Sequence, residues 1–331
     1  MTKNTADDRR KRLADIAREL VLKEEISIRD LAKKHHVSER TIRDDVSAIQ
    51  GTLVLSAGKG KLRFQTETYH DLARKTHLDL KVDVAAKTAS YLRDILTPYP
   101  RIAMSPGTTV CLVAAALVAE SYPTKFVTNS LAICDIPMPE ESLTLAGGLF
   151  AWGPRAVVGH QTVSAFEENK APVGILGVSG ASAAGELFVN NSLECTAVEA
   201  LIKSVSDLLI VVCDHSKLGK RDNWRVLDLS PDAEKRGSAT AFLGRQGMPK
   251  QVVFVTNGDL TTTRQRSLGE ADYKKQLDVR GELQLLEKST AGRVKVVLAS
   301  PDRAAYRKLR DIVPWMRGAN GESPENGGGK E

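Results

Sequence analysis

Seven short apolar runs, separated by stretches with helical spacing, follow the prolines at positions 98 and 100. The runs lie at 102–104, 125–127, 143–145, 173–177, 208–213, 251–255 and 294–298. Strand-like and helix-like segments that alternate in this way are typical of a parallel sheet, because each parallel connection must cross the sheet through another element. The sequence therefore predicts an α/β fold for residues 98–300. The irregular stretch at 231–249 is expected to be a long loop or insertion.

The chain has 331 residues, which suggests about two domains. Residues 67–97 have helical spacing and are expected to form a helical connector, whereas the Gly/Asn/Glu-rich residues 318–331 have little to bury and are expected to be disordered. No apolar run approaches the ~20 residues that span a bilayer, and no secretory signal is recognisable, so we expect a cytoplasmic protein with no membrane partner. The four cysteines are scattered and form no C-x-x-C pair. We expect neither disulfides, a metal site nor a cofactor.

Residues 8–66 differ from the rest in charge and pattern. Residues 1–66 hold 15 Lys and Arg against 10 Asp and Glu, whereas the remaining residues hold 32 against 31. Apolar side chains have helical spacing over 8–22, 28–36 and 39–49, and two β-prone runs follow at 53–55 and 62–64, joined by the Gly- and Lys-rich residues 56–61. Three short helices and a hairpin predict a winged helix-turn-helix, and the excess of positive charge indicates a partner such as double-stranded DNA.

The third helix of such a unit places its first residues against base edges in the major groove. Ser38 is the expected N-cap of this helix. The other candidate DNA contacts are Arg40 and Arg43, which can pair with guanine or phosphate, Thr41, which can contact phosphate or a thymine methyl, and the hairpin residues Lys59 and Lys61. Asp44 and Asp45 follow directly, and a carboxylate that faced DNA would reduce the affinity.

Four polar turns follow predicted strands. Ligands of open α/β sheets bind beyond the carboxyl ends of strands, and helix starts with small hydroxyl side chains form phosphate cradles. The turns therefore predict one anion site, whose candidate residues are Ser105, Gly107, Thr108 and Thr109 after the first strand, Thr128, Asn129 and Ser130 after the second, Gly147 and Gly148 after the third, and Asp214 and Lys217 after the fifth.

Residues 28–32 and 37–46 resemble the helix-turn-helix of the DeoR family of bacterial repressors. That family has a second arginine where this chain has Asp44. Residues from about 82 to about 219, including Gly159, resemble the sensor domain of the same family. Two features depart from the family pattern: Pro172 stands where an acidic residue is common, and the stretch 221–248 is longer.

The resemblance implies a sensor domain similar in fold to ribose-5-phosphate isomerase, joined to the winged helix-turn-helix. It also implies a repressor of a metabolic operon that is controlled by a phosphorylated sugar or related metabolite. We expect a homo-oligomer, because symmetric DNA binders place paired recognition helices on repeated or palindromic half-sites. Ser105, Gly107, Thr108 and Thr109 would hold the phosphate beside residues 128–130. Lys217 would contact a sugar oxygen or the anion, and Asp214 would orient Lys217.

Two other functions fit parts of the sequence. A sugar-phosphate isomerase needs a carboxylate base, for which Glu186 and Glu194 are the candidates, although no motif holds them. A helix-turn-helix can also serve as a protein contact module. We expect a regulator without catalytic residues, because an isomerase would leave the helix-turn-helix unexplained.

Overall fold

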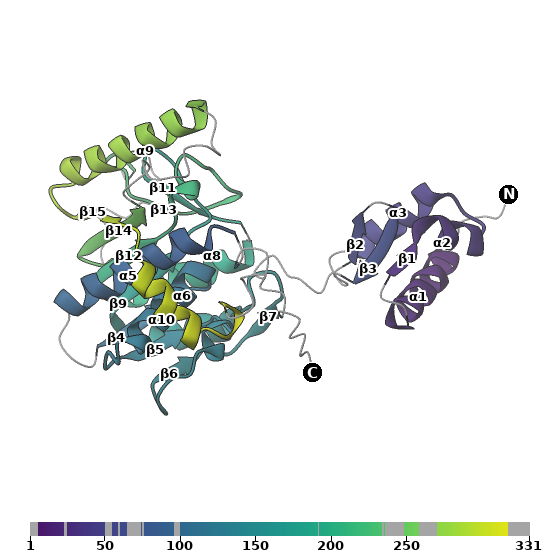
Figure 1. Cartoon of the computed structure of the whole chain (residues 1–331), viewed down its shortest axis with the longest axis horizontal. Helices are drawn as coiled ribbons and strands as arrows, with labels where there is room; N and C mark the ends of the chain where they lie inside the picture. The colour runs from purple at the N-terminus through teal and green to yellow at the C-terminus, as the bar shows by residue number, and fades with distance from the viewer. Residues whose placement is uncertain are drawn as a thin grey trace, which may run out of the picture. The chain divides into compact units, whose positions relative to one another are not determined.

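The computed structural model describes residues 6–22, 25–49, 55–58, 60–64, 74, 76–95, 100–190, 192–233, 235, 248–257 and 270–316. The chain divides into two compact units, residues 1–71 and residues 72–331 (Figure 1). The expected tail at 318–331 and most of the expected loop at 231–249 lie outside the described residues.

The described part of the smaller unit has three helices and one antiparallel sheet. Its elements are α1 (Ala6–Leu22), β1 (Glu25–Ser27), α2 (Ile28–Lys34), α3 (Glu39–Ile49), β2 (Leu55–Gly58) and β3 (Lys61–Phe64). The strands pair in the order β1-β3-β2. The three predicted helices and the hairpin are confirmed. Strand β1 was not predicted, because three residues are too few to show an alternating pattern.

The hairpin turn is shorter than the sequence suggested. We expected a turn over 56–61, but residues 56–58 belong to β2, and Gly58 pairs with Lys61. Only positions 59 and 60 connect the strands, and Gly60 has a φ of +76°, which glycine adopts without steric cost. The apolar residues 53 and 54, which suggested an earlier strand, lie outside the described residues.

The larger unit contains a seven-stranded sheet with helices on both faces. Its elements are α5 (Leu78–Ile95), β4 (Arg101–Met104), α6 (Thr108–Ala119), β5 (Lys125–Thr128), η1 (Ile133–Asp135), β6 (Leu143–Leu145), β7 (Leu149–Ala151), β8 (Ala156–Val158), α7 (His160–Glu168), β9 (Ala171–Gly177), β10 (Gly180–Ala181), β11 (Glu186–Val189), α8 (Ser192–Ser204), β12 (Val205–Val212), η2 (His215–Lys217), β13 (Trp224–Asp228), β14 (Gln251–Asn257), α9 (Glu270–Ser289), β15 (Val294–Ala299), α10 (Arg303–Ile312) and η3 (Pro314–Met316).

The large sheet has the strand order β15-β14-β12-β9-β4-β5-β6, and all its pairings are parallel. All seven predicted strands are confirmed as its members. Alternate side chains of the strands enter two separate cores: Ile102 and Met104 lie in one with α5, α6 and α10, and Ala103 lies in the other with α7, α8 and α9. Helices α5, α6 and α10 lie together in Figure 1. The sheet is therefore buried on both faces, as parallel sheets generally are.

Helix α5 lies in the segment that we expected to connect two domains. Its buried residues Leu78, Val82, Ala85, Ala89 and Leu92 belong to the core of the larger unit. The helix is thus packed on the sheet rather than extended between the units. None of the helices in the described part of the chain is both long enough and apolar enough to cross a membrane.

Candidate nucleic-acid interface and effector site

Helix α3 begins at a hydroxyl cap. The hydroxyl of Ser38 accepts a hydrogen bond from the backbone N–H of Thr41 (3.0 Å) and lies 2.8 Å from the Thr41 hydroxyl. The bond satisfies one of the N–H groups that a helix start leaves open, which confirms the predicted N-cap. Ser38 and Thr41 therefore fix the turn that presents the first residues of α3.

The two candidate arginines of α3 project into solvent. Arg40 has 91% of its side chain exposed and lies 3.9 Å from Asp44. Arg43, which is half exposed, donates to Glu39 over 3.2 Å. Exposed pairs one helical turn apart contribute only about 0.3–0.5 kcal/mol. Both guanidinium groups can therefore exchange these carboxylates for phosphates or guanine bases at little cost.

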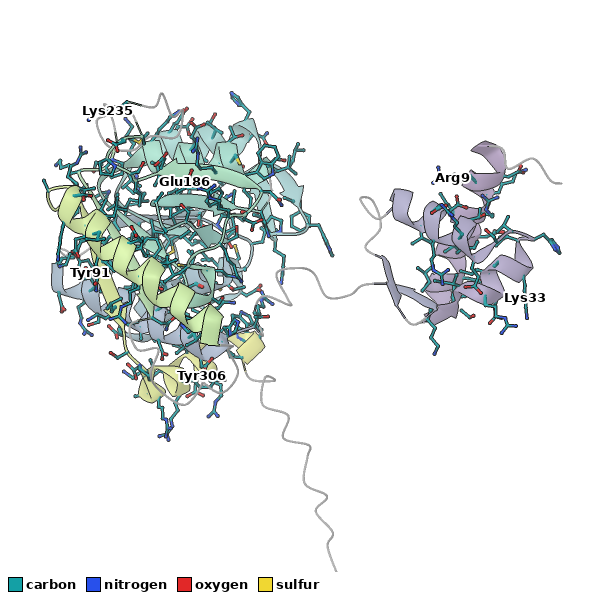
Figure 2. The ribbon with its side chains drawn as sticks, turned by 90° about the horizontal axis from the view of Figure 1, so that it is seen from above. Arg9, Lys33, Tyr91, Glu186, Lys235 and Tyr306 are labelled. Carbon is teal, nitrogen blue, oxygen red and sulfur yellow. The ribbon has the colours of Figure 1, made fainter. Side chains whose placement is uncertain are left out.

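The two aspartates of α3 have different environments. Asp44 has 71% of its side chain exposed, on the same helix as the arginines. Asp45 is buried and binds Arg12 of α1 through two contacts, at 2.8 and 2.9 Å, and Arg9 at 2.9 Å. Figure 2 labels Arg9 in this unit. Asp45 therefore holds α1 against α3, and of the two aspartates Asp44 is the one that could face DNA.

The hairpin turn is fixed to the helix-turn-helix. The backbone N–H of Ile28, the first residue of α2, donates to the carbonyl of Gly60 over 2.9 Å. Lys61 is exposed at the start of β3. Lys59, the other candidate of the hairpin, lies outside the described residues. The exposed Lys33 at the end of α2 adds a further positive charge to this unit (Figure 2).

The strand order of the large sheet reverses between β4 and β9. Strands that follow β4 in the chain add on one side as β5 and β6, whereas β9 and later strands add on the other. Open α/β sheets bind ligands at the carboxyl ends of the strands that flank such a reversal. Residues 105–109 follow β4 directly, so the first predicted turn lies at this point.

Three of the predicted site residues use their side chains to build the turns. The hydroxyl of Ser105 accepts from the N–H of Gly177 (2.9 Å) and donates to the carbonyl of Pro106 (3.1 Å). The Thr128 hydroxyl donates to Met104 (2.8 Å), and the Asn129 amide donates to Val157 (2.8 Å). These side chains tie β9, β4 and β5 together. They shape the site, and the sequence alone did not distinguish this role from a direct phosphate contact.

The start of α6 supplies groups that remain available for an anion. Gly107 precedes the helix with a φ of +141°, and Thr108 and Thr109 form its first two residues. The N–H groups of a first helical turn have no partners within the helix, and the helix dipole adds positive potential there. The hydroxyl of Ser130 is buried and has no hydrogen-bond partner among the described residues. These groups fit the phosphate cradle that the sequence predicts.

The third predicted turn lies beside the second. Asn129 exchanges two hydrogen bonds with Val157 of β8, and the hydroxyl of Thr162 donates to the carbonyl of Gly147 (2.7 Å). Gly148 is held against Val158, the residue next to Val157. A Cβ on Gly148 would lie 2.5 Å from the carbonyl oxygen of Val158, so this glycine permits close packing.

A buried lysine that the sequence analysis missed lies beside the turn after β12. Lys81 of α5 is only 4% exposed. Burial lowers the pKa of Lys81 to about 8; the carboxylate of Asp214 opposes this shift, and the ammonium of Lys217 adds to it. The sequence did contain a sign of this burial, because Lys81 stands among the apolar positions 78, 82 and 85, which share one face of the helix.

Asn257, at the end of β14, joins α5 to the same turn. Its side-chain amide donates to the carbonyl of Leu80 (3.0 Å), and its side-chain oxygen accepts from the N–H of His215 (3.3 Å). The Asp214 carboxylate accepts from the N–H of Ser216 (3.0 Å) and so caps η2. Asn257 and Asp214 thereby hold the turn after β12 beside the first turn of α5.

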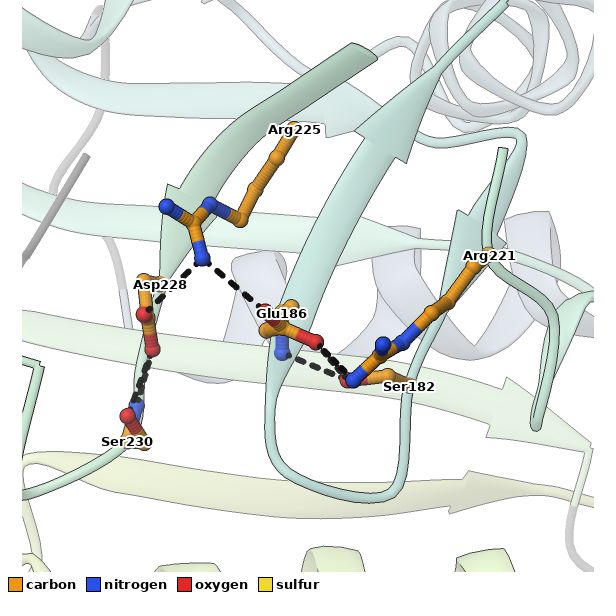
Figure 3. A network of polar contacts seen from close by, with 6 residues as sticks. All are labelled: Ser182, Glu186, Arg221, Arg225, Asp228 and Ser230. Carbon is orange, nitrogen blue, oxygen red and sulfur yellow. Dashed lines mark hydrogen bonds and ion pairs between the residues drawn. The ribbon is translucent and has the colours of Figure 1, made fainter. Parts of the chain in front are cut away.

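Glu186, one candidate isomerase base, is the centre of an ion-pair network (Figure 3). Its carboxylate binds Arg221 at 2.8 Å and Arg225 at 2.9 Å, and it accepts from the Ser182 hydroxyl at 3.0 Å. Arg225 also lies 3.7 Å from the fully buried Asp228. Both carboxylate oxygens of Glu186 are thus already bound by guanidinium groups. The network therefore favours a structural role for Glu186, which connects β11 to β13.

Glu194, the other candidate base, lies in the first turn of α8. Burial, with a contribution from Asp222, raises the pKa of Glu194 to about 7. Such a value suits a proton acceptor at neutral pH.

Among the residues that the structure describes, no three His, Cys, Asp or Glu side chains gather in a way that could hold a metal ion.

Structural neighbours of this chain include sugar-phosphate enzymes at low similarity. Ribose 5-phosphate isomerase A from Methanocaldococcus jannaschii aligns with a TM-score of 0.30 and 14% identity, over 43% of this chain and 55% of that one. The decarboxylase AibA/AibB aligns with a TM-score of 0.33 and 13% identity, over 72% of this chain and 98% of that one.

Sequence relatives are transcription regulators. The glycerol-3-phosphate regulon repressor of Escherichia coli is 29% identical over 201 residues, which cover 59% of this chain and 77% of that protein. The lactose phosphotransferase system repressor of Streptococcus mutans is 26% identical over 230 residues, which cover 66% and 88%. Residues 76–231 match the family model of the DeoR C-terminal sensor domain. Residues 76–231 are therefore similar to the DeoR C-terminal sensor domain and follow a helix-turn-helix, and the relatives named here are repressors.

Proposed function

We propose that this regulator represses a metabolic operon by binding double-stranded DNA through residues 8–66, and that a phosphorylated sugar or related metabolite bound within residues 98–300 controls the binding. The observation that carries the proposal is the start of α3, where a capped turn presents two exposed arginines. The relatives named above support the choice of a sugar-related operon, since they are repressors of a glycerol-3-phosphate regulon and a lactose phosphotransferase system.

The DNA contacts divide into two kinds. Arg40 and Arg43 would approach base edges from the first turn of α3, with Thr41 at the adjacent phosphate. Lys61, together with Lys59, would contact the flanking backbone from the hairpin. Ser38 would act mainly as the cap that fixes these residues, because its hydroxyl already binds Thr41.

The effector contacts would lie around the strand-order reversal. The first turn of α6, with Gly107, Thr108 and Thr109, would bind the phosphate through backbone N–H groups, and the Ser130 hydroxyl would complete the cradle. Ser105, Thr128 and Asn129 would hold the turns in place. Lys217 would bind the anion from the turn after β12, which is separated from β4 by β9.

Control of DNA binding would follow from a shift in population. A homo-oligomer would place two helix-turn-helix units on repeated half-sites, as symmetric DNA binders do. A metabolite that binds one arrangement of the subunits more tightly shifts the population toward it. If that arrangement misplaces the recognition helices, the metabolite releases the operator.

DNA binding is tested by selecting duplexes from a randomised library on the full-length protein and measuring their affinity by fluorescence anisotropy. Arg40→Gln and Arg43→Gln should each weaken binding about tenfold or more, since a good bidentate contact provides about 1–3 kcal/mol. Lys203→Gln, on the exposed side of α8 in the larger unit, is the matched control and should leave the affinity unchanged. Selection that enriches no sequence would refute the DNA-binding proposal.

Effector binding is tested by thermal shift with glycerol 3-phosphate, ribose 5-phosphate and glucose 6-phosphate, each paired with its unphosphorylated parent compound. We expect stabilisation by at least one phosphorylated compound and by none of the parents. Lys217→Ala should remove most of the stabilisation. If no phosphorylated compound stabilises the protein, or if Lys217→Ala leaves the shift intact, the effector site is wrong.

The isomerase alternative depends on Glu194, whose pKa of about 7 suits a base. Glu186 is less suitable because two arginines bind its carboxylate. We propose that the chain is not an enzyme. Incubation with ribose 5-phosphate should give no ketose product. A ketose product formed by the wild type but not by Glu194→Gln would show that the chain is an isomerase.

A further inference from the structure

An uncharged, largely apolar surface lies at one edge of the large sheet. Residues 142–154 contain no Asp, Glu, Lys, Arg or His, although 27% of the chain is charged. Four large apolar side chains of this stretch are exposed to solvent: Leu145, Leu149, Phe150 and Trp152. We call these four side chains the apolar patch. Single exposed apolar residues are common, whereas four in one short stretch require an explanation.

The aromatic part of the patch forms one surface. Trp152 has 53% of its surface exposed, and its ring packs edge to face on that of Phe150, with the centroids 5.4 Å apart. Aromatic side chains have about 150–250 Å² of surface each, so two half-exposed rings leave on the order of 200 Å² in water, and the two leucines roughly double this area. Apolar patches of several hundred Å² often mark a binding surface.

The strands that carry the patch each have an open edge. Strand β6 is the last strand of the large sheet (Figure 1), and among the described residues it pairs only with β5. In the same part of the chain, β7 pairs only with β8. An open edge presents backbone groups that another strand can bind, and proteins usually protect it with charged side chains. Neither β6 nor β7 contains a charged residue, so both edges suit a partner.

We propose that the apolar patch is the surface through which two copies of this chain associate. In a two-fold symmetric pair the same patch of each copy meets the other, so a charged patch would bring like charges together, whereas an uncharged patch does not. Identical edge strands related by a two-fold axis also run antiparallel, and can pair. The inference rests on the proposed function and adds to it the face that brings two helix-turn-helix units together on repeated half-sites.

The size and the composition of the patch agree with a second copy as the partner. Stable interfaces bury about 800 Å² of each partner and have an apolar centre, rich in aromatic residues, inside a polar rim. The apolar patch has roughly half that area, which is the size of such a centre. Residues 318–331 of the same chain are a poor alternative, because they contain no large apolar side chain that could cover the patch.

The test is the mass of the full-length protein in solution, measured by sedimentation velocity from nanomolar to tens of micromolar protein. We expect a dimer. Leu149, which has 75% of its surface exposed, can be replaced without disturbing the core. Leu149→Lys should raise the dissociation constant about thirtyfold or more, because it places a charge among apolar groups. Leu285→Lys, at an exposed leucine of α9, is the matched control and should keep the wild-type dissociation constant.

A second pair of variants makes the test independent of any one substitution. Trp152→Ser should also weaken the dimer about thirtyfold or more, since large aromatic residues at the centre of an interface contribute most of the binding energy. Trp224→Ser, at a tryptophan of β13 with similar exposure, should leave the mass unchanged. If Leu149→Lys does not fold, as circular dichroism would show, this second pair decides.

Two results would overturn the proposal. The first is a wild type that stays monomeric at every concentration; shielding of Trp152 from iodide in that monomer would then indicate a segment of the same chain over the patch, and free quenching would indicate a different partner. The second is an oligomer that neither Leu149→Lys nor Trp152→Ser weakens, because the copies would then associate through another face. The measurement involves neither DNA nor metabolite, so a dimer that selects no DNA sequence would refute the DNA-binding proposal alone.

Discussion

Replacing Asp45 tests whether a buried ion pair holds the DNA-binding unit together. The carboxylate of Asp45 and the guanidinium of Arg12 have 5% and 6% of their side chains exposed and lie 2.8 Å apart. Asp45→Asn removes the carboxylate that binds the buried guanidinium of Arg12. Removing one partner of a buried pair costs about 3–5 kcal/mol, whereas the half-exposed Arg9 contributes little.

This loss is comparable to the whole stability of the smaller unit. A unit of residues 1–71 is expected to have only about 3–5 kcal/mol from its core. Asp45→Asn should therefore unfold this unit in a large fraction of molecules at 25 °C. The larger unit, which has its own two-layered core, should remain folded.

The assay is hydrogen exchange followed by mass spectrometry on the full-length protein. Amides of α1 and α3 should lose protection in Asp45→Asn, while those of β9 and β12 should not change, and DNA retention should disappear although Asp45 does not face DNA. Asp44→Asn is the matched control and should leave exchange unchanged, because this neighbouring carboxylate is exposed. Native protection of α3 in Asp45→Asn would refute the argument.

Three further substitutions, at Asp44, Gly148 and Lys81, should change either the DNA affinity or the stability of the larger unit. Asp44→Asn should raise DNA affinity about fivefold, because it removes an exposed negative charge from the recognition helix, as anisotropy would show. Gly148→Ala should destabilise the larger unit by about 2 kcal/mol or more, measured by urea unfolding, since its Cβ would meet Val158 and Thr162 at 2.5 and 2.6 Å with φ at +146°. Lys81→Met should stabilise that unit at pH 7 by up to about 3 kcal/mol, which corresponds to a pKa lowered from 10.5 to about 8. In the wild type, stability should rise with pH between about 8 and 10.5, because only the unfolded state remains protonated there.

Each of these expectations has a control and a contrary result. An unchanged or lower DNA affinity in Asp44→Asn would show that this carboxylate does not face DNA. Gly147→Ala is the control for its neighbour, since an added Cβ there meets nothing within 4 Å, and equal stability of the two variants would contradict the packing argument. A destabilised Lys81→Met at pH 7 would mean that compensating charges outweigh the burial of Lys81.

The sequence predicted the large sheet well because of how parallel strands are buried. Strands covered on both faces consist of continuous apolar residues, and residues 208–213 and 251–255 show this clearly. The strands that were missed, β1, β7, β8, β10, β11 and β13, have only two to five residues and pair antiparallel in small sheets. Such short segments carry no recognisable period, so their pairing follows from tertiary contacts.

The sequence predicted where the turns of the candidate site lie, but not which hydrogen bonds their side chains form. Strand ends and small polar residues located the turns, but the sequence could not tell that the hydroxyl of Ser105 binds Gly177, a residue 72 positions away in the chain. Asn257 was missed for the same reason, since its partner Leu80 is 177 positions away. Local spacing predicts the element, whereas the hydrogen-bond partner depends on the strand order.

The place of α5 in the chain suggests why an effector contact there would matter. Residues 65–73 and 75, which lie outside the described residues, connect the DNA-binding unit to this helix. Asn257 binds the first turn of α5 and the turn after β12 at once. An anion held by Lys217 would add its own attraction to that junction. Allosteric control requires only that the ligand favour one arrangement of an element shared by both functions. Helix α5 would be such an element, because Asn257 links its first turn to the turn that carries Lys217 and its chain leads to the helix-turn-helix unit.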